Sequence, residues 1–444
     1  MRPEVAAPTP WPFPRPERHQ LSNGITVLLY DLPGQHVIST SLVLDHSLAA
    51  EPGPYEGITA MVARTLTEGT TAHPGERFAE LLENQGAAIG ADVDQSGTQV
   101  MMDVPATRLA AAMPLLAEVV RLPGLTDSDV RRQVDLRLAD LAQLRANSAA
   151  TAGIEYRRRV VDTAARAGRP AGGEDAQVST LTGALVRDWA SKLLVPAATT
   201  VVVGGDLGDA SAVLDLVESC FGDWNGPAPS VVHPTPGAGL PGCTIIDRPG
   251  SVQADLRLGG WAVDRFDTRW PALRVASYAI GGSFNSRINT VLREEKGYTY
   301  GARVAFTPLR SGGWWAAQGS FRTEVVGDAI ATARDLLDVT VAPFTADEVR
   351  DAQQYFTGAS PLQYATADGV VDQAALQLMM GLPDDYLDQS LAQVLSVTPQ
   401  LATEAYATIV DTEQLTCVVV GDAEALEPQV RAAGLEPTVV PIES

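Results

Sequence analysis

The sequence predicts an α+β fold built from two homologous halves, and three observations carry this prediction. The chain has 444 residues, which is too long for one hydrophobic core and predicts two to four domains. The segments TTVVVGGDLGDAS (199–211) and LTCVVVGDAEALE (415–427) are both β-rich runs that end in Gly-Asp before a helical pattern, and aligning Val203 with Val420 gives an offset of 217 residues. Hairpin patterns stand beside helices without regular strand–helix alternation, which favours an α+β fold over a doubly wound sheet.

These repeats divide the chain into four parts. Residues 1–20 are rich in proline and predict an extended N-terminal arm. Residues 21–225 form the first α+β domain, and residues 244–444 form the second. Between them, residues 226–243 are rich in Pro and Gly, as in an extended linker.

Helical and strand periodicities are clear in the first half. The segment EGITAMVARTLTEGT (56–70) predicts a helix between a glycine turn and a Gly-Thr stop, with Ile58, Met61, Val62 and Leu66 on one apolar stripe. Residues 77–105 predict a helix, a glycine stop and a β-hairpin. Residues 106–123 and 127–147 predict two long amphipathic helices.

Composition excludes several classes of protein. The net charge of −22 argues against nucleic-acid binding, because phosphate recognition needs clustered Lys and Arg. No apolar run approaches the roughly 20 residues that span a bilayer, and the N-terminus lacks the apolar core of a signal peptide. Cys220, Cys243 and Cys417 lie far apart, which predicts buried free thiols in a reducing compartment. We therefore expect a cytoplasmic protein.

The helix within residues 56–70 has an unusually plain polar side. Ala60, Ala63 and Arg64 point away from the apolar stripe, so the helix is expected to present a small face closed by one arginine. The five histidines of the chain are scattered, and none has a second histidine four residues later. The sequence alone therefore predicts no metal-ligand cluster on this helix.

The succession of these elements, with LLENQGAAIGADVD (81–94) and the repetition of the whole arrangement, resembles the pitrilysin-like (inverzincin) zinc peptidases. Mitochondrial processing peptidase and its two-chain bacterial relatives form the nearest branch. The resemblance covers nearly the full chain and implies a duplicated mitochondrial processing peptidase-like fold.

The resemblance also implies where a zinc site would stand. Catalytic members carry His-x-x-Glu-His on this helix and a glutamate about 75 residues later. The motif falls on Ala60, Ala63 and Arg64, and the third-ligand position falls near Asp140. We therefore expect a degenerate zinc motif and no metal in this chain. The alternative is an ordinary helix that never held a metal.

The most specific stretch of the second half is GGSFNSRINTVLREEKGYTYGARVAF (281–306). Gly281 and Gly282 predict a flexible entry, and Ser283 or Asn285 can cap the helix that follows. The predicted apolar stripe of that helix is Phe284, Ile288, Val291 and Leu292. The helix is expected to end at Gly297, and Tyr300 is expected to open an alternating strand.

In the family, an arginine and a tyrosine seven residues apart in this segment bind the substrate backbone and support the tetrahedral intermediate in a closed chamber. Arg293 and Tyr300 have this spacing, so the resemblance assigns them a catalytic role together with a partner chain, and Gly281 and Gly282 a role in binding substrate. The plain alternatives are a solvated helix arginine and a core tyrosine that shares a face with Val304.

Together these observations predict a non-catalytic subunit of a heterodimeric zinc peptidase. Its partner is expected to be a homologous chain that carries His-x-x-Glu-His and the zinc, and its substrate a peptide. A structural or peptide-binding scaffold without a role in hydrolysis is the alternative. A metallopeptidase with improvised ligands is disfavoured, because the sequence has no histidine cluster.

Overall fold

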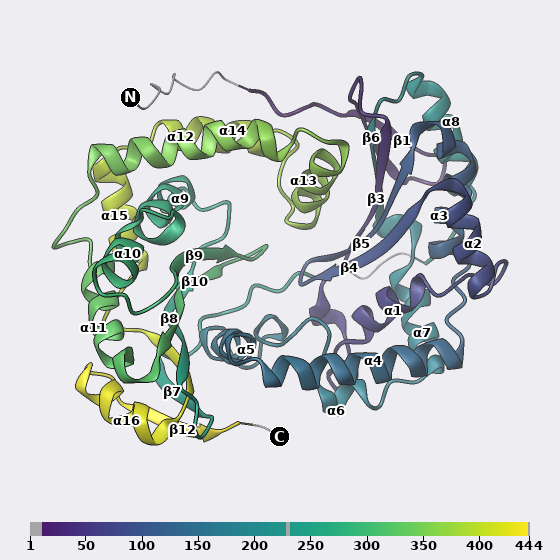
Figure 1. Cartoon of the computed structure of the whole chain (residues 1–444). Coiled ribbons are helices and arrows are strands. Elements are labelled where there is room, and N and C mark those ends of the chain that lie inside the picture. Colours follow the sequence, from purple (N-terminus) through teal and green to yellow (C-terminus); the bar gives the residue numbers. More distant parts are fainter. Residues whose placement is uncertain (1–10, 228–230, 443–444) are drawn as a thin grey trace.

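The computed structural model describes residues 11–227 and 231–442, and it contains two six-stranded mixed sheets that face each other (Figure 1). Residues 1–10 of the predicted arm and 228–230 of the predicted linker lie outside the described residues. In spatial order, the first sheet consists of β1 (Glu17–Gln20), β2 (Thr26–Asp31), β6 (Thr199–Gly205), β3 (Val37–Asp45), β5 (Gly97–Pro105) and β4 (Ala88–Asp94). The second consists of β12 (Pro437–Pro441), β7 (Gly242–Asp247), β11 (Thr416–Gly421), β8 (Gln253–Ala262), β10 (Gly313–Arg322) and β9 (Ala302–Pro308).

The two sheets repeat one topology, which confirms the predicted duplication. Strand orders β2-β6-β3-β5-β4 and β7-β11-β8-β10-β9 correspond position by position, and the parallel pair β2/β6 has its counterpart in β7/β11. The edge strands differ, because β1 runs antiparallel to β2 whereas β12 runs parallel to β7. The predicted α+β fold class is therefore correct, and its repeat extends to the pairing of the strands.

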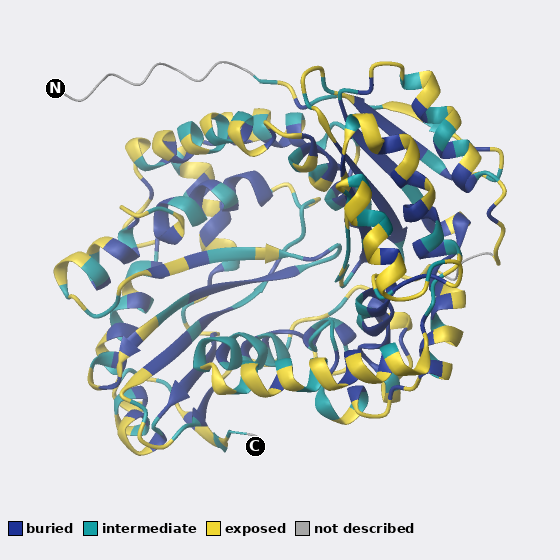
Figure 2. Cartoon of the chain, turned by 45° about the vertical axis from the view of Figure 1, so that its right-hand side comes forward, coloured by how far each residue is buried: buried dark blue, intermediate teal, exposed yellow. Residues whose placement is uncertain are grey.

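Apart from α5 and α13, helices of each half cover the outer face of its own sheet. The helices before the linker are α1 (Ile58–Leu66), α2 (Glu76–Gln85), α3 (Leu109–Arg121), α4 (Asp127–Ala146), α5 (Ser148–Val160), α6 (Asp175–Val178), α7 (Gly183–Leu193) and α8 (Ala210–Phe221). Those after it are α9 (Trp270–Ser277), α10 (Arg287–Asn289), α11 (Val326–Leu337), α12 (Ala346–Gln363), α13 (Ala367–Met379), α14 (Tyr386–Leu395), α15 (Pro399–Ile409) and α16 (Ala423–Ala432). Buried residues line the strands and the inward faces of these helices, and exposed residues lie on the outward faces of the helices (Figure 2).

Two helices are exchanged between the halves. Helix α5 precedes the linker but packs on β8 and β11 of the second sheet, where Ala152, Tyr156 and Val160 join a core with Val418 and Val420. Helix α13 follows the linker but packs on β3 and β6 of the first sheet. Its residues Val370, Val371, Ala374 and Met379 join a core with strand residues that include Leu28 and Val43. Each sheet is thus closed on its inner face by a helix from the other half (Figure 1).

The described part of the predicted arm is held against the second half. Phe13 is buried against Tyr364, with ring centroids 5.3 Å apart, and its backbone N–H donates to the Asp388 carboxylate. Arg15 pairs with the same carboxylate, and Arg18 pairs with Asp384. Residues 11–18 therefore bridge the two halves.

Candidate functional site

Helix α1 is preceded by Gly57, whose backbone conformation favours glycine. Gly57 has a φ of 92°, and a Cβ on it would lie 2.7 Å from the backbone of Gly173, so a larger residue would be both strained and crowded. The carboxylate of Glu51 accepts hydrogen bonds from the backbone N–H groups of Gly57 and Thr59, and so caps the helix. The predicted apolar stripe is buried as expected.

The positions of the degenerate zinc motif come together across α1 and α4. The Arg64 guanidinium lies 2.9 Å from the Asp140 carboxylate, and its Nε donates to the Gln133 side chain at 3.3 Å. The resemblance assigned Arg64 to the second histidine position of the motif and Asp140 to the third-ligand position. An ion pair therefore joins the two residues that the sequence analysis placed at ligand positions.

This arrangement does not fit zinc. Ala60 and Ala63 carry no donor atoms, and a guanidinium has only N–H donors and a fixed positive charge, so only Asp140 could ligate a cation. Over residues 11–227 and 231–442, no group of three or more His, Cys, Asp and Glu side chains could hold a metal ion. The sequence analysis expected a small face closed by Arg64, and Ala63 on that face is only 4% exposed, because α4 and α7 pack against α1.

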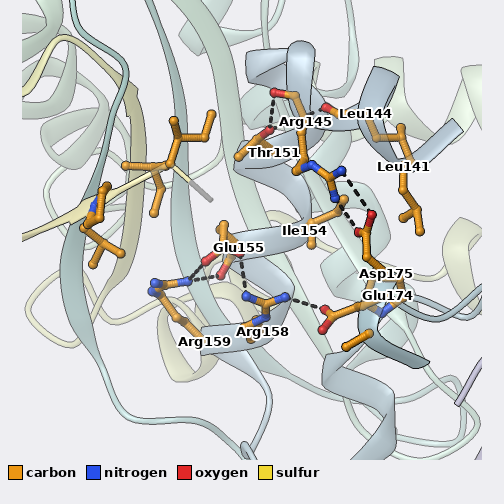
Figure 3. A pocket seen from close by; sticks show the side chains of 16 residues that line it. Leu141, Leu144, Arg145, Thr151, Ile154, Glu155, Arg158, Arg159, Glu174 and Asp175 are labelled. Carbon is orange, nitrogen blue, oxygen red and sulfur yellow. Dashed lines mark hydrogen bonds and ion pairs between the residues drawn. The ribbon is translucent and has the colours of Figure 1, made fainter. Parts of the chain in front are cut away.

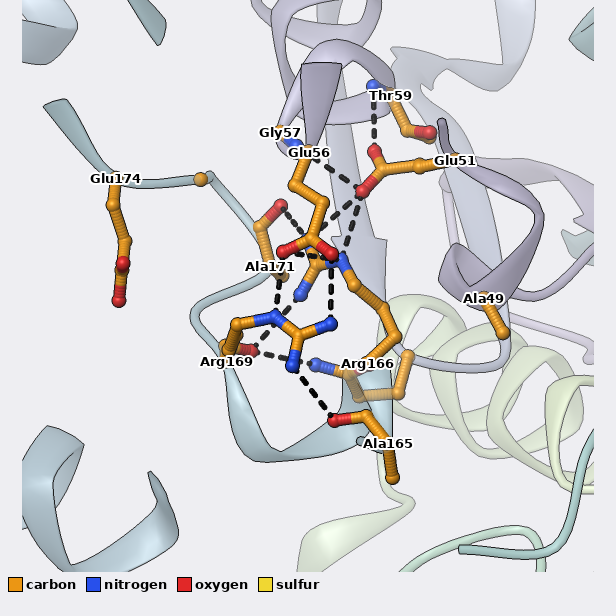
Figure 4. Close-up of polar contacts among 12 residues, drawn as sticks. Ala49, Glu51, Glu56, Gly57, Thr59, Ala165, Arg166, Arg169, Ala171 and Glu174 are labelled. Carbon is orange, nitrogen blue, oxygen red and sulfur yellow. Dashed lines mark hydrogen bonds and ion pairs between the residues drawn. The ribbon is translucent and has the colours of Figure 1, made fainter. Parts of the chain in front are cut away.

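A second polar cluster lies at the beginning of α1 (Figure 4). The side chains of Glu51 and Arg166 are 0% and 5% exposed. The Glu51 carboxylate accepts hydrogen bonds from Nε of Arg166 at 3.0 Å and from Nη2 of Arg166 at 2.9 Å. Arg169 makes a two-bond pair with Glu56, 2.7 Å for each bond. These pairs join the start of α1 to the loop that follows α5 and fix the entry of the helix.

The Arg293 segment differs from its predicted form. The N-cap is Ser286 rather than Ser283 or Asn285, so the helix begins at Arg287, and residues 290–295 continue it as a wider π-helical turn. Phe284, predicted in the apolar stripe, precedes the helix and is 65% exposed. The Arg293 guanidinium lies 3.5 Å from the centre of the Phe284 ring and pairs with Glu294 at 2.8 Å.

Tyr300 also departs from expectation. Strand β9 begins at Ala302, so Tyr300 does not open it and does not share a core face with Val304. Its side chain is 100% exposed. The structure therefore excludes the core-tyrosine alternative. Gly297, with a φ of 64°, follows the helix as predicted.

The two glycines do not form a flexible entry. Gly281 is buried in the π-helical turn Tyr278–Gly282, and a Cβ on it would lie 2.3 Å from the backbone nitrogen of Val304. Close packing against β9 therefore explains Gly281. Gly282 belongs to the same turn, where a Cβ would be 3.3 Å from the Ser277 carbonyl oxygen.

The ion pairs were not foreseen from the sequence. Arg64 and Asp140 are 76 residues apart, and Glu51 and Arg166 are 115 residues apart. The only available signal was the position of Asp140 in the family motif, which identified the residue but not its partner.

Comparisons with known proteins identify the family of this chain. The family model described as Insulinase (Peptidase family M16) matches residues 26–160, and that described as Peptidase M16 inactive domain matches residues 180–356. An uncharacterized zinc protease of Mycobacterium tuberculosis is 24% identical over 333 residues, which cover 73% of this chain and 74% of that protein. The chain therefore belongs to the M16, or pitrilysin-like, peptidase family, as the sequence predicted.

Solved structures show the same fold. The crystal structure of a peptidase M16 inactive domain from Pseudomonas fluorescens superposes with a TM-score of 0.85 at 20% identity, over 92% of this chain and 98% of that one. A chain of Complex III2 from Candida albicans gives a TM-score of 0.79 at 15% identity, over 95% of this chain and 100% of that one. Among the described residues, no helix is both long and apolar enough to cross a bilayer.

Proposed function

We propose that this chain is the non-catalytic subunit of a two-chain zinc peptidase. The observation that supports the proposal is the Arg64–Asp140 ion pair, since it joins two residues that the resemblance assigns to ligand positions and their groups do not fit zinc. In this proposal the zinc and its general base belong to a homologous partner that carries His-x-x-Glu-His. This chain supplies groups that bind a peptide at the shared site.

The groups in question are Arg293 and Tyr300. A guanidinium can donate paired hydrogen bonds to a peptide carbonyl, and a phenol can donate to a developing oxyanion. Tyr300 supports this role because a wholly exposed aromatic side chain contributes nothing to the folded core of this chain. Arg293 would exchange its contact with Glu294, which is 57% exposed, for the substrate.

The second candidate is a scaffold subunit with no part in hydrolysis. It is favoured by the present contacts of Arg293, which pairs with Glu294 and stacks on Phe284, both within this chain. The similar fold of a chain in Complex III2 from Candida albicans supports the same candidate, because that chain is one component of a larger assembly.

Reconstitution with the zinc-bearing partner separates the two candidates. Arg293→Ala and Tyr300→Phe are each expected to reduce peptide cleavage by about 10²–10³-fold, the usual effect of removing an oxyanion donor. Assembly and the zinc content of the complex should stay unchanged. Full activity in both variants would contradict the catalytic role and leave the scaffold.

The matched control is Arg303→Ala, because Arg303 is an exposed arginine on the neighbouring strand β9. Arg287 is closer to Arg293 in sequence but is unsuitable. Its guanidinium pairs with Glu348 and donates to the carbonyls of Ala342 and Pro343, so its removal would disturb the fold.

A further inference from the structure

One arginine of the exchanged helix α5 is stacked but not paired. The Arg157 guanidinium lies 5.1 Å from the ring centre of Trp314. Within residues 11–227 and 231–442, its side chain makes no hydrogen bond and no ion pair. The carboxyl group of Asp94 acts electrostatically on Arg157 from beyond ion-pair distance. Burial raises the pKa of the Asp94 carboxyl. Arg157 therefore keeps its N–H donors available.

The neighbouring arginines of α5 behave differently (Figure 3). Arg158 and Arg159 both pair with Glu155, and they line a pocket of about 390 Å³ whose lining does not include Arg157. The Arg158 guanidinium also pairs with Glu174. Within the described residues, Glu155, the one carboxylate of α5, pairs with Arg158 and Arg159 and not with Arg157.

Arg157 and Trp314 line a pocket of about 330 Å³. Its lining residues are Ala149, Ala150, Gly153, Ile154, Arg157, Pro170 and Trp314. Packing does not require a glycine at 153, because a Cβ built there meets no atom within 4 Å, and glycine inside a helix costs about 0.5–1 kcal/mol relative to alanine. The missing side chain keeps the space beside Arg157 open.

This pocket lies on the inner side of the second sheet. Along β10, Trp315 belongs to the core beneath the outer helices, and Trp314 belongs to the core formed with α5. Helix α5 forms one wall of the pocket, and Asp94 at the end of β4 in the first half acts electrostatically on Arg157. A peptide held between the two sheets would therefore meet it.

We propose that the Arg157–Trp314 pocket binds a carboxylate of the peptide, either its C-terminal group or an Asp or Glu side chain. The planar guanidinium presents parallel N–H groups that match a carboxylate in a two-bond pair, and the indole holds its plane in place. Pro170 and Ile154 give the flanking part of the peptide an apolar wall. This proposal rests on the proposed function, since it names a group of the substrate.

The energetics favour such a ligand. Burial lowers the pKa of Arg157, but an arginine remains charged at neutral pH. A carboxylate would match both the positive charge of Arg157 and the geometry of its N–H donors. Arg166, whose positive charge also acts on Arg157, is already neutralised by Glu51.

The test uses the full chain labelled with 5-fluorotryptophan and followed by ¹⁹F NMR. The Trp314 resonance is assigned with Trp314→Phe, and the chain has 7 tryptophans, so the remaining signals report on the fold. The probes are acetyl-Ala-Ala-Phe with a free carboxylate, the same peptide as its C-terminal amide, and acetyl-Asp-Ala-Phe-amide. The first and third distinguish a terminal from a side-chain carboxylate.

A carboxylate probe is expected to shift the Trp314 resonance saturably, and the plain amide is not. Arg157→Gln should weaken binding on the order of 10- to 100-fold, because it removes a charged two-bond pair. Gly153→Leu should abolish binding by filling the pocket. Arg158→Gln, one residue away on α5, should change the affinity by less than about twofold, since its side chain lies in the other pocket.

Equal binding of acid and amide, no shift with either carboxylate probe, or unchanged affinity in Arg157→Gln with the other resonances intact would overturn the proposal. These results are independent of cleavage. If carboxylate binding fails while Arg293→Ala still reduces hydrolysis, only the subsite is wrong. If binding succeeds while cleavage is unaffected by Arg293→Ala and Tyr300→Phe, the catalytic role is wrong and a peptide-binding scaffold remains.

Discussion

Replacing Glu51 with glutamine should destabilise the protein strongly, because it removes one charge from a buried pair. The Glu51 carboxylate is fully buried, accepts two bonds from Arg166 and caps α1 through Gly57 and Thr59. Breaking a buried ion pair by removing one partner costs about 3–5 kcal/mol. Glu56 lies 3.7 Å from Arg166 and retains some compensation, so we expect the lower end, about 3 kcal/mol.

The measurement is the urea midpoint of unfolding, combined with hydrogen exchange at the first amides of α1. The reference variant is Asp188→Asn, which breaks an exposed pair with Lys192 whose side chains are 65% and 59% accessible. Exposed pairs contribute about 0–1 kcal/mol, so this variant should barely move the midpoint. Equal midpoints in the two variants, or unchanged exchange at α1, would refute the reasoning.

Three further predictions follow from the site and the fold. Protein that is purified without metal and then loaded with zinc should retain less than about one equivalent of zinc by elemental analysis, because Ala60, Ala63 and Arg64 offer no ligand. One tightly held equivalent would contradict this prediction. Burial lowers the pKa of His46 from 6.5 to about 4, so its protonation favours the unfolded chain. The stability of the folded chain that is present above pH 6.5 should therefore fall between pH 6.5 and 4. The urea midpoint of His46→Gln should fall less over this window than that of the wild type. Equal falls in the two proteins would show that His46 does not cause the pH dependence. A fragment of residues 21–225 expressed alone should be insoluble or bind ANS, because without α13 the first sheet exposes apolar residues such as Leu28 and Val43. A monomeric fragment that unfolds cooperatively would disprove this prediction.

Much of the fold was predictable because it is written in local periodicity and in repetition. The helices α1, α3 and α4 and the hairpin β4–β5 carry clear apolar patterns, and the repeated Gly-Asp strand ends locate β6 and β11. The exchange of α5 and α13 was not predictable. An amphipathic helix shows which of its faces is buried, but it does not show which of two similar sheets it covers.

The candidate site was predictable only in part. The family motif located Arg64 and Asp140, but it could not show that they pair, since that contact depends on how α1 crosses α4. The form of the Arg293 segment depends on tertiary packing. Gly281 must fit against Val304, residues 290–295 form a wider turn, and β9 begins only at Ala302. Local helix and strand propensities do not depend on such tertiary contacts, so they could not predict the form of this segment.

The exchanged helices have a consequence for the integrity of the chain. Because α5 lies in the second half and α13 in the first, the halves are interlocked without any help from the covalent connection between residues 226 and 243. A protease that nicked this connection would leave two fragments, each containing a helix that closes the other's sheet. Gel filtration would show one particle of unchanged size, and only denaturing electrophoresis would reveal the cut.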